Sequence, residues 1–322
     1  MNFSPARFDG RRFKNNSKRR PRSGLDGLRW LLSRPRSSWP RYVANSAAPK
    51  PIARVEDGSI RATLVGHATV LLQVAGLNIL TDPVWSERIG PLSWLGVKRV
   101  RPPAIAFEDL PAIDVVLLSH DHYDHLDRPT LARLSTRSNP LVVTGRKVGA
   151  SVPAKRVVEL DWWEEAELGP GSKVTYVPAE HFSGRGIFDR NASLWGGFVL
   201  ETPAGQIYFA GDTGDGPHFA QIKECFGPMT LSLLPIGAYA PRWFMSPVHI
   251  DPAEAVEASI TLESHTSLAI HFGTFCLADD DIDAPASELS KALREARRTN
   301  RGLDFKIPVF GKPIVIDHKM RE

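Results

Sequence analysis

Cysteine is scarce in this chain of 322 residues: it occurs at Cys225 and Cys276, and neither belongs to a Cys-x-x-Cys pair. Two cysteines cannot form a disulfide framework. The sequence has no apolar stretch near Met1, which argues against a secretory signal peptide. It also has no run of about 18 or more apolar residues, which excludes a transmembrane helix. We therefore expect a soluble protein of a reducing compartment, located in the cytoplasm.

Positive charge is concentrated in the first 50 residues, which hold thirteen Lys and Arg against Asp9 and Asp26. This local excess of +11, set against a net charge of +4, leaves −7 on the rest of the chain. The composition predicts a basic N-terminal arm over residues 1–55 and one globular domain over residues 56–322. Such an arm suits peripheral contact with anionic lipid or nucleic acid, although a solvated extension that wraps and neutralises the domain is the simpler interpretation. Within the arm, the leucines of Leu25–Leu32 share one helical face, which fits a surface helix or a membrane-interface anchor.

Short apolar runs separated by turn residues predict strands through most of the globular region. The predicted strands are Ile60–Val65, Thr69–Val74, Leu77–Thr81, Ile113–Leu118, Leu141–Thr144, Val174–Val177, Trp195–Leu200, Ile207–Ala210, Leu231–Pro235, Leu268–His271, Phe305–Val309 and Ile314–Ile316. Helices are predicted from about Pro129, after the N-cap Asp251, and over Ala284–Arg298. Because early hairpins accompany an alternation of strands and helices, we expect an α/β fold of two mixed sheets packed together with helices outside.

The segment Ser119–Asp127 is the sharpest chemical feature of the sequence. It reads Ser-His-Asp-His-Tyr-Asp-His-Leu-Asp and directly follows the predicted buried strand Ile113–Leu118. Residues two apart in an extended chain point the same way, so His120 and His122 can bind one metal ion. Asp124 and His125 follow where the chain must turn, and they can face a second ion. Imidazole and carboxylate ligands suit zinc, and also iron or manganese.

Further candidate ligands stand at the ends of other predicted strands. His181 follows the stretch Val174–Glu180, Asp212 follows Ile207–Ala210, and His271 closes the run Leu268–Ile270. Each of these residues alone would be weak evidence. Together they give a consistent set for two ions, with His120, His122 and His181 at one, Asp124, His125 and His271 at the other, and Asp212 bridging.

These residues resemble the metallo-β-lactamase-fold hydrolases, whose hallmark is His-x-His-x-Asp-His followed by distant His, Asp and His. Within them the chain is most similar to the branch of N-acyl-phosphatidylethanolamine-hydrolysing phospholipase D and its bacterial relatives. The closer similarity runs from about residue 60 to about residue 276 and rests on four segments: Gly66–Leu71, Leu80–Pro83 through Arg101–Pro103, Ser119–Asp127 and Gly237–Met245. The resemblance implies an αββα sandwich with a dimetal site at the sheet edges.

The resemblance also implies a mechanism. Two zinc ions, or iron or manganese in their place, would share a bridging hydroxide that attacks phosphorus, and the seven proposed ligands would hold them. Asp124 is then both a ligand and a catalytic residue, and His249 stands near the substrate, where it or water protonates the leaving group. Asp82 and His67 are expected to support the ligating imidazoles. The expected substrate is a phospholipid or a small phosphodiester, contacted by loop aromatics such as Trp85, Trp94 and Trp243–Met245 and by Lys98, Arg99 and Arg101.

Other functions stay open at this point. A lactonase acting on a phosphorylated sugar lactone would share every ligand. A non-enzymatic module that binds membrane or nucleic acid through the basic arm has no reason to keep all seven ligands, and a nuclease would need an additional clamping domain. A redox di-iron protein would typically carry an acid where His122 stands. Nucleic acid is therefore not the expected partner, and the sequence leaves the oligomeric state open.

Overall fold

The first of two large sheets is built from the N-terminal half of the globular region and one late strand. The computed structural model describes residues 4–17, 23–34, 38–92, 94–169, 171–186, 188–300 and 302–317. In spatial order the seven strands are β10 (Val157–Leu160), β9 (Leu141–Gly145), β8 (Val115–Leu118), β5 (Leu77–Thr81), β4 (Thr69–Val74), β3 (Ile60–Gly66) and β18 (Ile314–Ile316). Strands β10, β9, β8 and β5 run parallel, whereas β5, β4, β3 and β18 pair antiparallel.

The second sheet also has seven strands, and it too is mixed. Its order is β11 (Glu165–Gly169), β12 (Ser172–Val177), β13 (Gly197–Thr202), β14 (Gly205–Phe209), β15 (Leu231–Pro235), β16 (Thr266–Ile270) and β17 (Phe305–Lys306). The first four strands form an antiparallel meander, and the last four run parallel. The carboxyl ends of β14, β15 and β16 therefore meet at one edge.

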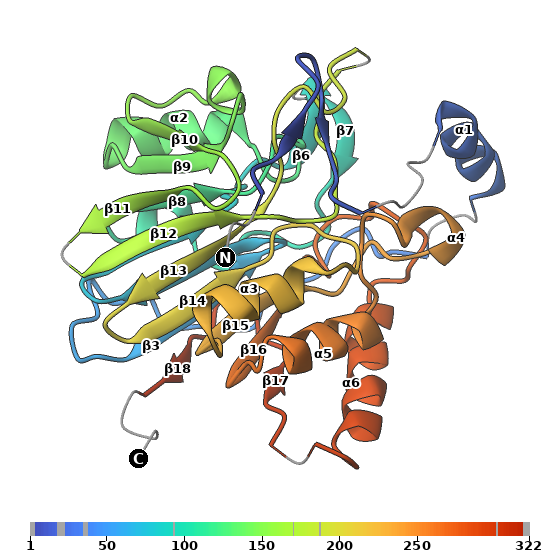
Figure 1. The fold of residues 1–322 in the computed structure, drawn as a ribbon. Coiled ribbons are helices and arrows are strands. Elements are labelled where there is room, and N and C mark those ends of the chain that lie inside the picture. The colour runs from blue at the N-terminus through green and yellow to red at the C-terminus, as the bar shows by residue number, and fades with distance from the viewer. Residues whose placement is uncertain are drawn as a thin grey trace.

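The two sheets pack face to face because alternate side chains along each strand point into the space between them. On β8, Val115 and Leu117 join the central core, whereas Val116 and Leu118 join a separate core on the outer face. Helix α2 (Arg128–Arg137) covers that outer face with Leu131 and Leu134. The architecture is thus the predicted αββα sandwich (Figure 1).

Three helices cover the outer face of the second sheet: α3 (His218–Phe226), α5 (Pro252–Thr261) and α6 (Ala284–Ala296). Helix α5 begins where the sequence predicted, because Asp251 accepts hydrogen bonds from the backbone N–H groups of Ala253 and Glu254, and Glu254 closes a capping box. The two short helices α1 (Gly24–Ser33) and α4 (Arg242–Met245) lie side by side (Figure 1). Over the described residues, the structure has no helix of the length and hydropathy needed to cross a membrane.

Several elements escaped the sequence prediction. They are two hairpins, β1 (Arg7–Phe8) with β2 (Phe13–Lys14) and β6 (Arg88–Leu92) with β7 (Leu95–Lys98), together with the edge strands β10 and β11, helix α3, and the single 3-10 turns at Phe107–Asp109 and Gly149–Ser151. These strands are short, and most of their residues are exposed or only partly buried, so they lack the apolar runs on which the prediction relied.

The described part of the N-terminal arm packs onto the body of the protein. Ala6 and Phe13 are buried and belong to the central core, and the backbone N–H of Ala6 donates a hydrogen bond to Asp161. The predicted helix in the arm is present as α1, and its side chains are not buried. The division into an arm over residues 1–55 and a domain over residues 56–322 remains a prediction.

Candidate metal centre

The predicted ligands come together at one edge of the sandwich because most of them directly follow strand ends. His120, His122, Asp124 and His125 lie on the loop between β8 and α2, in the first sheet. His181, Asp212 and His271 follow β12, β14 and β16 of the second sheet. Strands fix the backbone on one side of each ligand, while the head groups extend into the space where the two sheets meet.

Three imidazoles form the first group of candidate ligands. The ring nitrogen Nδ1 of His122 lies 2.8 Å from Nε2 of His120 and 3.3 Å from Nε2 of His181. The opposite nitrogen of His181 lies 2.9 Å from the carbonyl oxygen of Val248, to which it can only donate, so Nε2 is left with its lone pair. Nδ1 of His120 is likewise 2.9 Å from the Ser119 hydroxyl. The three nitrogens that face one another are therefore available to a cation.

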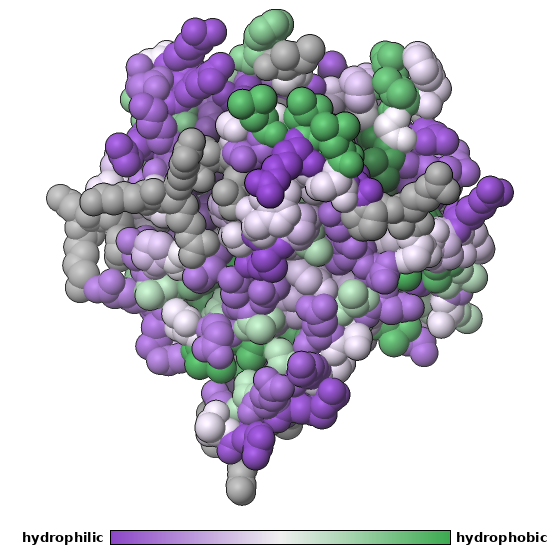
Figure 2. All heavy atoms as spheres, turned by 90° about the vertical axis from the view of Figure 1, so that its right-hand side faces the viewer, coloured by the Kyte–Doolittle hydropathy of each residue, from purple (hydrophilic) through white to green (hydrophobic). Residues whose placement is uncertain are grey.

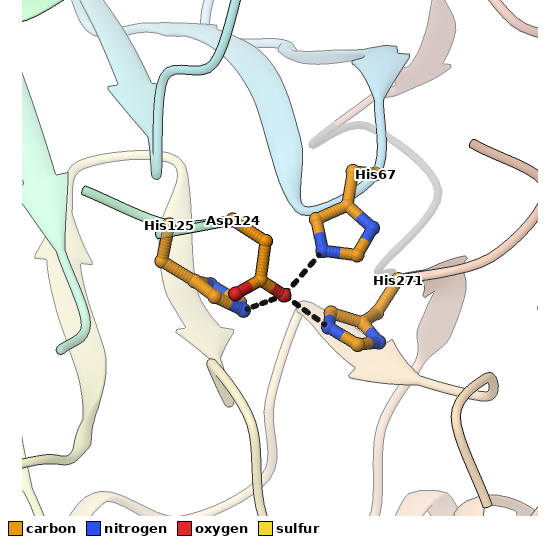
Figure 3. A group of neighbouring side chains, drawn as sticks. All are labelled: His67, Asp124, His125 and His271. Carbon is orange, nitrogen blue, oxygen red and sulfur yellow. Dashed lines mark hydrogen bonds and ion pairs between the residues drawn. The ribbon is translucent and has the colours of Figure 1, made fainter. Parts of the chain in front are cut away.

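The second group is centred on the Asp124 carboxylate (Figure 3). Its Oδ2 lies 3.0 Å from Nε2 of His67, 3.3 Å from Nε2 of His125 and 3.5 Å from Nε2 of His271. His67 and His271 reach this point from backbone positions with φ of 55° and 61°, the left-handed region that is costly for residues other than glycine. The sequence analysis expected His67 to support a ligand; the structure places it among the candidate ligands themselves.

Asp212 lies between the two groups, where the sequence analysis expected a bridging ligand. Its Oδ2 is 3.1 Å from Nε2 of His125 and 3.8 Å from Nε2 of His181, and its Oδ1 is 3.1 Å from Nε2 of His271. One carboxylate therefore contacts side chains of both groups.

Asp82 supports the site from behind. It is fully buried, and its Oδ2 lies 2.6 Å from Nδ1 of His125 and accepts a 2.6 Å hydrogen bond from the Ser119 hydroxyl. Its Oδ1 accepts from the Ser119 backbone N–H. A carboxylate that accepts from Nδ1 leaves the Nε2 lone pair of His125 directed at the site, the role that buried carboxylates play behind metal-bound imidazoles.

Burial and neighbouring charges set different protonation states for the candidate ligands. Burial lowers the pKa of His120 and His181 well below the ordinary value, so both rings are neutral near pH 7. At Asp124 and Asp212, burial alone would raise the pKa, but the neighbouring imidazoles outweigh it and hold both carboxyls well below their usual range. At His125 and His271, burial is in turn outweighed by the neighbouring carboxylates, chiefly Asp212, which raise the pKa of His125 well above its ordinary value and that of His271 to about 9. Both rings therefore hold a proton that a bound cation would replace.

Unpaired buried atoms at the site support its fit to metal ions. Among the described residues, Oδ1 of Asp212 and Nε2 of His271 are buried without a hydrogen-bond partner, although only 3.1 Å separates them. Two donor atoms this close and otherwise unpaired suit a common cation, which would take the place of the proton on His271. The imidazole and carboxylate donors fit a pair of divalent ions and do not distinguish zinc from iron or manganese.

A cavity of about 860 Å³ adjoins both groups of ligands. His122, Asp124, His181 and Asp212 line one side, and His249 lies on the same wall with its Nδ1 3.9 Å from Oδ2 of Asp212. Burial lowers the pKa of His249 to about 4, so the ring is neutral near pH 7. The structure thus places the seven predicted ligands and His249 at this one cavity or directly behind it.

The opposite wall comes from the N-terminal arm, which the sequence analysis did not connect with the site. Phe13 and Asn15 line the cavity, as do Gly24, Gly27 and Trp30 of α1. The Asn15 side-chain amide donates to the carbonyl oxygen of His181 at 2.9 Å, and its oxygen accepts from Nε1 of Trp195 at the same distance. No sequence signal connects Asn15 with His181, because the pairing spans 166 residues.

The residues proposed for substrate contact divide into two sets. Phe244 and Met245 line the cavity as expected. Arg99 instead points inward and donates to the carbonyl oxygens of Ser86 and Val84. The remaining members do not line the cavity: Arg101 stacks on Phe310, Lys98 pairs with Glu87, Trp85 packs against Phe107, and Trp94 and Trp243 are exposed.

Comparisons with known proteins agree with this geometry. The model of the Beta-lactamase superfamily domain matches residues 77–272. N-acyl-phosphatidylethanolamine-hydrolyzing phospholipase D 1 of Caenorhabditis elegans is 37% identical over 264 residues, which cover 77% of this chain and 74% of that protein. An uncharacterized protein of Mycobacterium tuberculosis is 40% identical over 263 residues, covering 78% of this chain and 70% of its own length. A solved metallo hydrolase of Ignicoccus hospitalis shares the fold, with a TM-score of 0.60 at 20% identity over 80% of this chain and 99% of that one.

Proposed function

Because this chain belongs to the metallo-β-lactamase superfamily of metal-dependent hydrolases, we propose that it is a phosphodiesterase acting on N-acyl phosphatidylethanolamine. Water adds to phosphorus, the bond between phosphorus and the ethanolamine oxygen breaks, and that oxygen takes up a proton. The products are phosphatidic acid and N-acylethanolamine. Support comes from the similar phospholipase D of Caenorhabditis elegans and from a mitochondrial one of Saccharomyces cerevisiae, 36% identical over 70% of this chain and 50% of that protein.

The observation that carries the proposal is the chemistry of the cavity walls. Aromatic and aliphatic side chains line the cavity beside the ligands: Phe13, Phe182, Phe244, Met245 and Leu277. Apolar walls that end at a charged centre suit an amphiphilic substrate whose acyl chains and phosphodiester need different surroundings.

Two arginines add positive charge to this cavity. Arg12 and Arg190 both line it, and no carboxylate among the described residues pairs with either guanidinium. Arg190 stacks on Phe182, with 4.0 Å between its guanidinium carbon and the ring centre, and Phe182 in turn contacts the ring of His122. The positive charge therefore lies one ring away from a candidate ligand, where it attracts an anionic phosphodiester.

The residues of the site would have separate roles in metal binding, ligand orientation and substrate positioning. Bound divalent ions would supply Lewis acidity and lower the pKa of water. His120, His122 and His181 would hold one ion, while Asp124, His125 and His271 would hold the other, with His67 beside Asp124 and Asp212 between the two. Asp82 keeps His125 oriented. His249, on the cavity wall, would position the substrate as a neutral hydrogen-bond donor, which leaves water as the source of the proton for the leaving group.

The test combines metal content with two assays. We expect close to two metal ions per chain by mass spectrometry, cleavage of bis-p-nitrophenyl phosphate, and release of N-acylethanolamine from N-acyl phosphatidylethanolamine. His122→Ala should abolish both activities, whereas His265→Ala, a histidine outside the site, should leave them unchanged.

Three outcomes decide between the functions considered. Protein that binds metal and cleaves neither phosphodiester contradicts the proposal and favours the lactonase alternative. Protein that binds no metal when supplied with zinc, iron and manganese contradicts the whole ligand set. In that case the binding module becomes the better hypothesis.

A further inference from the structure

Helix α1 is held in place by side chains other than its leucines. Nε1 of Trp30 donates to Asp279 at 2.9 Å, and the ring of Trp30 stacks on Phe244 with 5.0 Å between ring centres. Arg34, at the end of the helix, pairs with the same Asp279 at 2.9 Å. Ser23 and Asp26 form a capping box at the start. The helix is thus fixed in orientation against α4 and the loop that carries Asp279.

This orientation turns an apolar face towards solvent. Leu25, Leu28, Leu31 and Leu32 are 78%, 53%, 61% and 81% exposed. The view of this side of the molecule shows hydrophobic side chains gathered amid hydrophilic ones (Figure 2). Leucines clustered on one short helix differ from the scattered apolar residues of ordinary surfaces and mark an interaction site.

The sequence that surrounds this helix is basic. The first 50 residues carry a net charge of +11, and Lys18, Arg19, Arg20 and Arg22 precede the helix in the sequence. Arg29 lies on the helix itself, with its guanidinium carbon 5.0 Å from the ring centre of Trp243. Exposed leucines and an indole beside a cluster of basic residues are the composition of a helix that lies in the interface of an anionic bilayer.

The same helix borders the cavity. Gly24, Gly27 and Trp30 line the cavity. A membrane in contact with the leucines would therefore lie next to the cavity that leads to His122 and Asp212. We propose that α1, through its four exposed leucines, docks the protein on anionic phospholipid bilayers with the cavity beside the membrane surface. This inference deepens the proposed function, because it provides the route by which a membrane lipid would reach the site.

Vesicle flotation of the full chain tests the docking surface. Two vesicle types are compared, phosphatidylcholine alone and phosphatidylcholine with about one third phosphatidylglycerol, at low and high salt. The wild type should float with the anionic vesicles, and less so at high salt. Leu28→Gln/Leu31→Gln keeps the charge and the helix propensity and should reduce the vesicle-bound fraction about tenfold or more, since two leucines no longer insert.

The matched control is Val315→Gln on β18, a similarly exposed apolar position (45%) on a strand far from α1 (Figure 1). It should float like the wild type. Bis-p-nitrophenyl phosphate activity and thermal unfolding should be the same in all three proteins, because neither leucine lines the cavity.

Equal flotation of the wild type and the double variant overturns the proposal, as does equal flotation on neutral and anionic vesicles. Absence of vesicle binding together with retention of a short DNA duplex overturns it too and assigns the arm to nucleic acid. Flotation requires no hydrolysis, so a protein that floats as expected and leaves N-acyl phosphatidylethanolamine intact contradicts the proposed function and leaves the docking surface standing.

Discussion

Asp82 does not line the cavity, but its hydrogen bond fixes the orientation of the His125 ring. The carboxylate is fully buried, accepts from Nδ1 of His125 and from both polar groups of Ser119, and occupies a backbone position with φ of 31°. Ser119 in turn is 2.9 Å from Nδ1 of His120. One side chain therefore orients residues in both groups of candidate ligands.

Replacing Asp82 with asparagine should weaken metal binding about 10- to 100-fold, since removal of a carboxylate behind a ligating imidazole has effects of this size. The amide can turn an N–H towards His125 and stabilise the wrong tautomer. The measurement is metal content by mass spectrometry after dialysis against a graded series of chelator concentrations.

The control for this change is Asp109→Asn, which removes only an exposed pair with Lys50 and should retain metal like the wild type. Identical retention in Asp82→Asn would show that the carboxylate stabilises the loop and has no effect on the metal site.

At the scale of the elements, the sequence predicts most accurately those strands and helices that have a distinctive residue pattern of their own. The runs that became β3, β4, β5 and β15 were all predicted within a residue or two, because they are buried apolar strands. The candidate metal ligands were proposed for the same reason, as polar residues that follow such runs. The hairpin β1–β2 has no such pattern, because its stability comes from Phe13 entering a core that is built by residues far along the chain.

The hairpin β1–β2 should detach when its buried aromatic residue is removed. Phe13 is 3% exposed and Phe8, whose ring centre is 4.6 Å away, is 40% exposed. Phe13→Ala should weaken the docking of the arm by about 3 kcal/mol, the cost of truncating a core phenylalanine. The arm contains many Lys and Arg residues, so the rate of tryptic cleavage within it reports its release.

Phe8→Ala should have a much smaller effect on that rate. If the arm is cleaved equally fast in the wild type and in both variants, the packing of Phe13 does not hold it. Metal content should stay the same throughout, because the arm supplies none of the candidate ligands.

The capping box of α5 should be measurable in the unfolding free energy. Asp251 accepts two backbone hydrogen bonds at the start of the helix, just after His249. Asp251→Ala should reduce the free energy of unfolding in urea by about 1 kcal/mol. Asp283 occupies the same position at the start of α6 without a side-chain cap, and Asp283→Ala should therefore have almost no effect. Similar losses in both variants would contradict the role of the cap.

At the scale of the whole molecule, the site connects two sheets that the chain builds largely in succession. His120, His122, Asp124 and His125 belong to the first sheet, and His181, Asp212 and His271 to the second. The layers could be predicted from the sequence because the strand pattern repeats along the chain, and the structure brings the predicted ligands together where those strands end. It did not predict the cavity wall, since contacts such as that of Asn15 with His181 depend on how distant segments pack.

Because the ligands come from both sheets, bound metal should stabilise the whole fold. A ligand present at about 1,000 times its dissociation constant adds about 4 kcal/mol to stability. For a domain of this size, we expect chelation to lower the melting temperature by roughly 10 °C. Scanning calorimetry with and without chelator measures this shift. His122→Ala should show a smaller shift than the wild type, and an unchanged wild-type melting temperature would mean that the ions do not bridge the sheets.

The order of these ligands along the chain has a consequence for how the protein matures. A ribosome synthesises His120 to His125 first, then His181 and Asp212, and last His271, which follows His125 by 146 residues. Until β16 has joined its sheet, a nascent chain offers a cation an incomplete set of donors, and β18, which completes the first sheet beside β3, is made later still. We therefore expect stable metal binding to be a late event in biogenesis, one that requires the nearly finished fold.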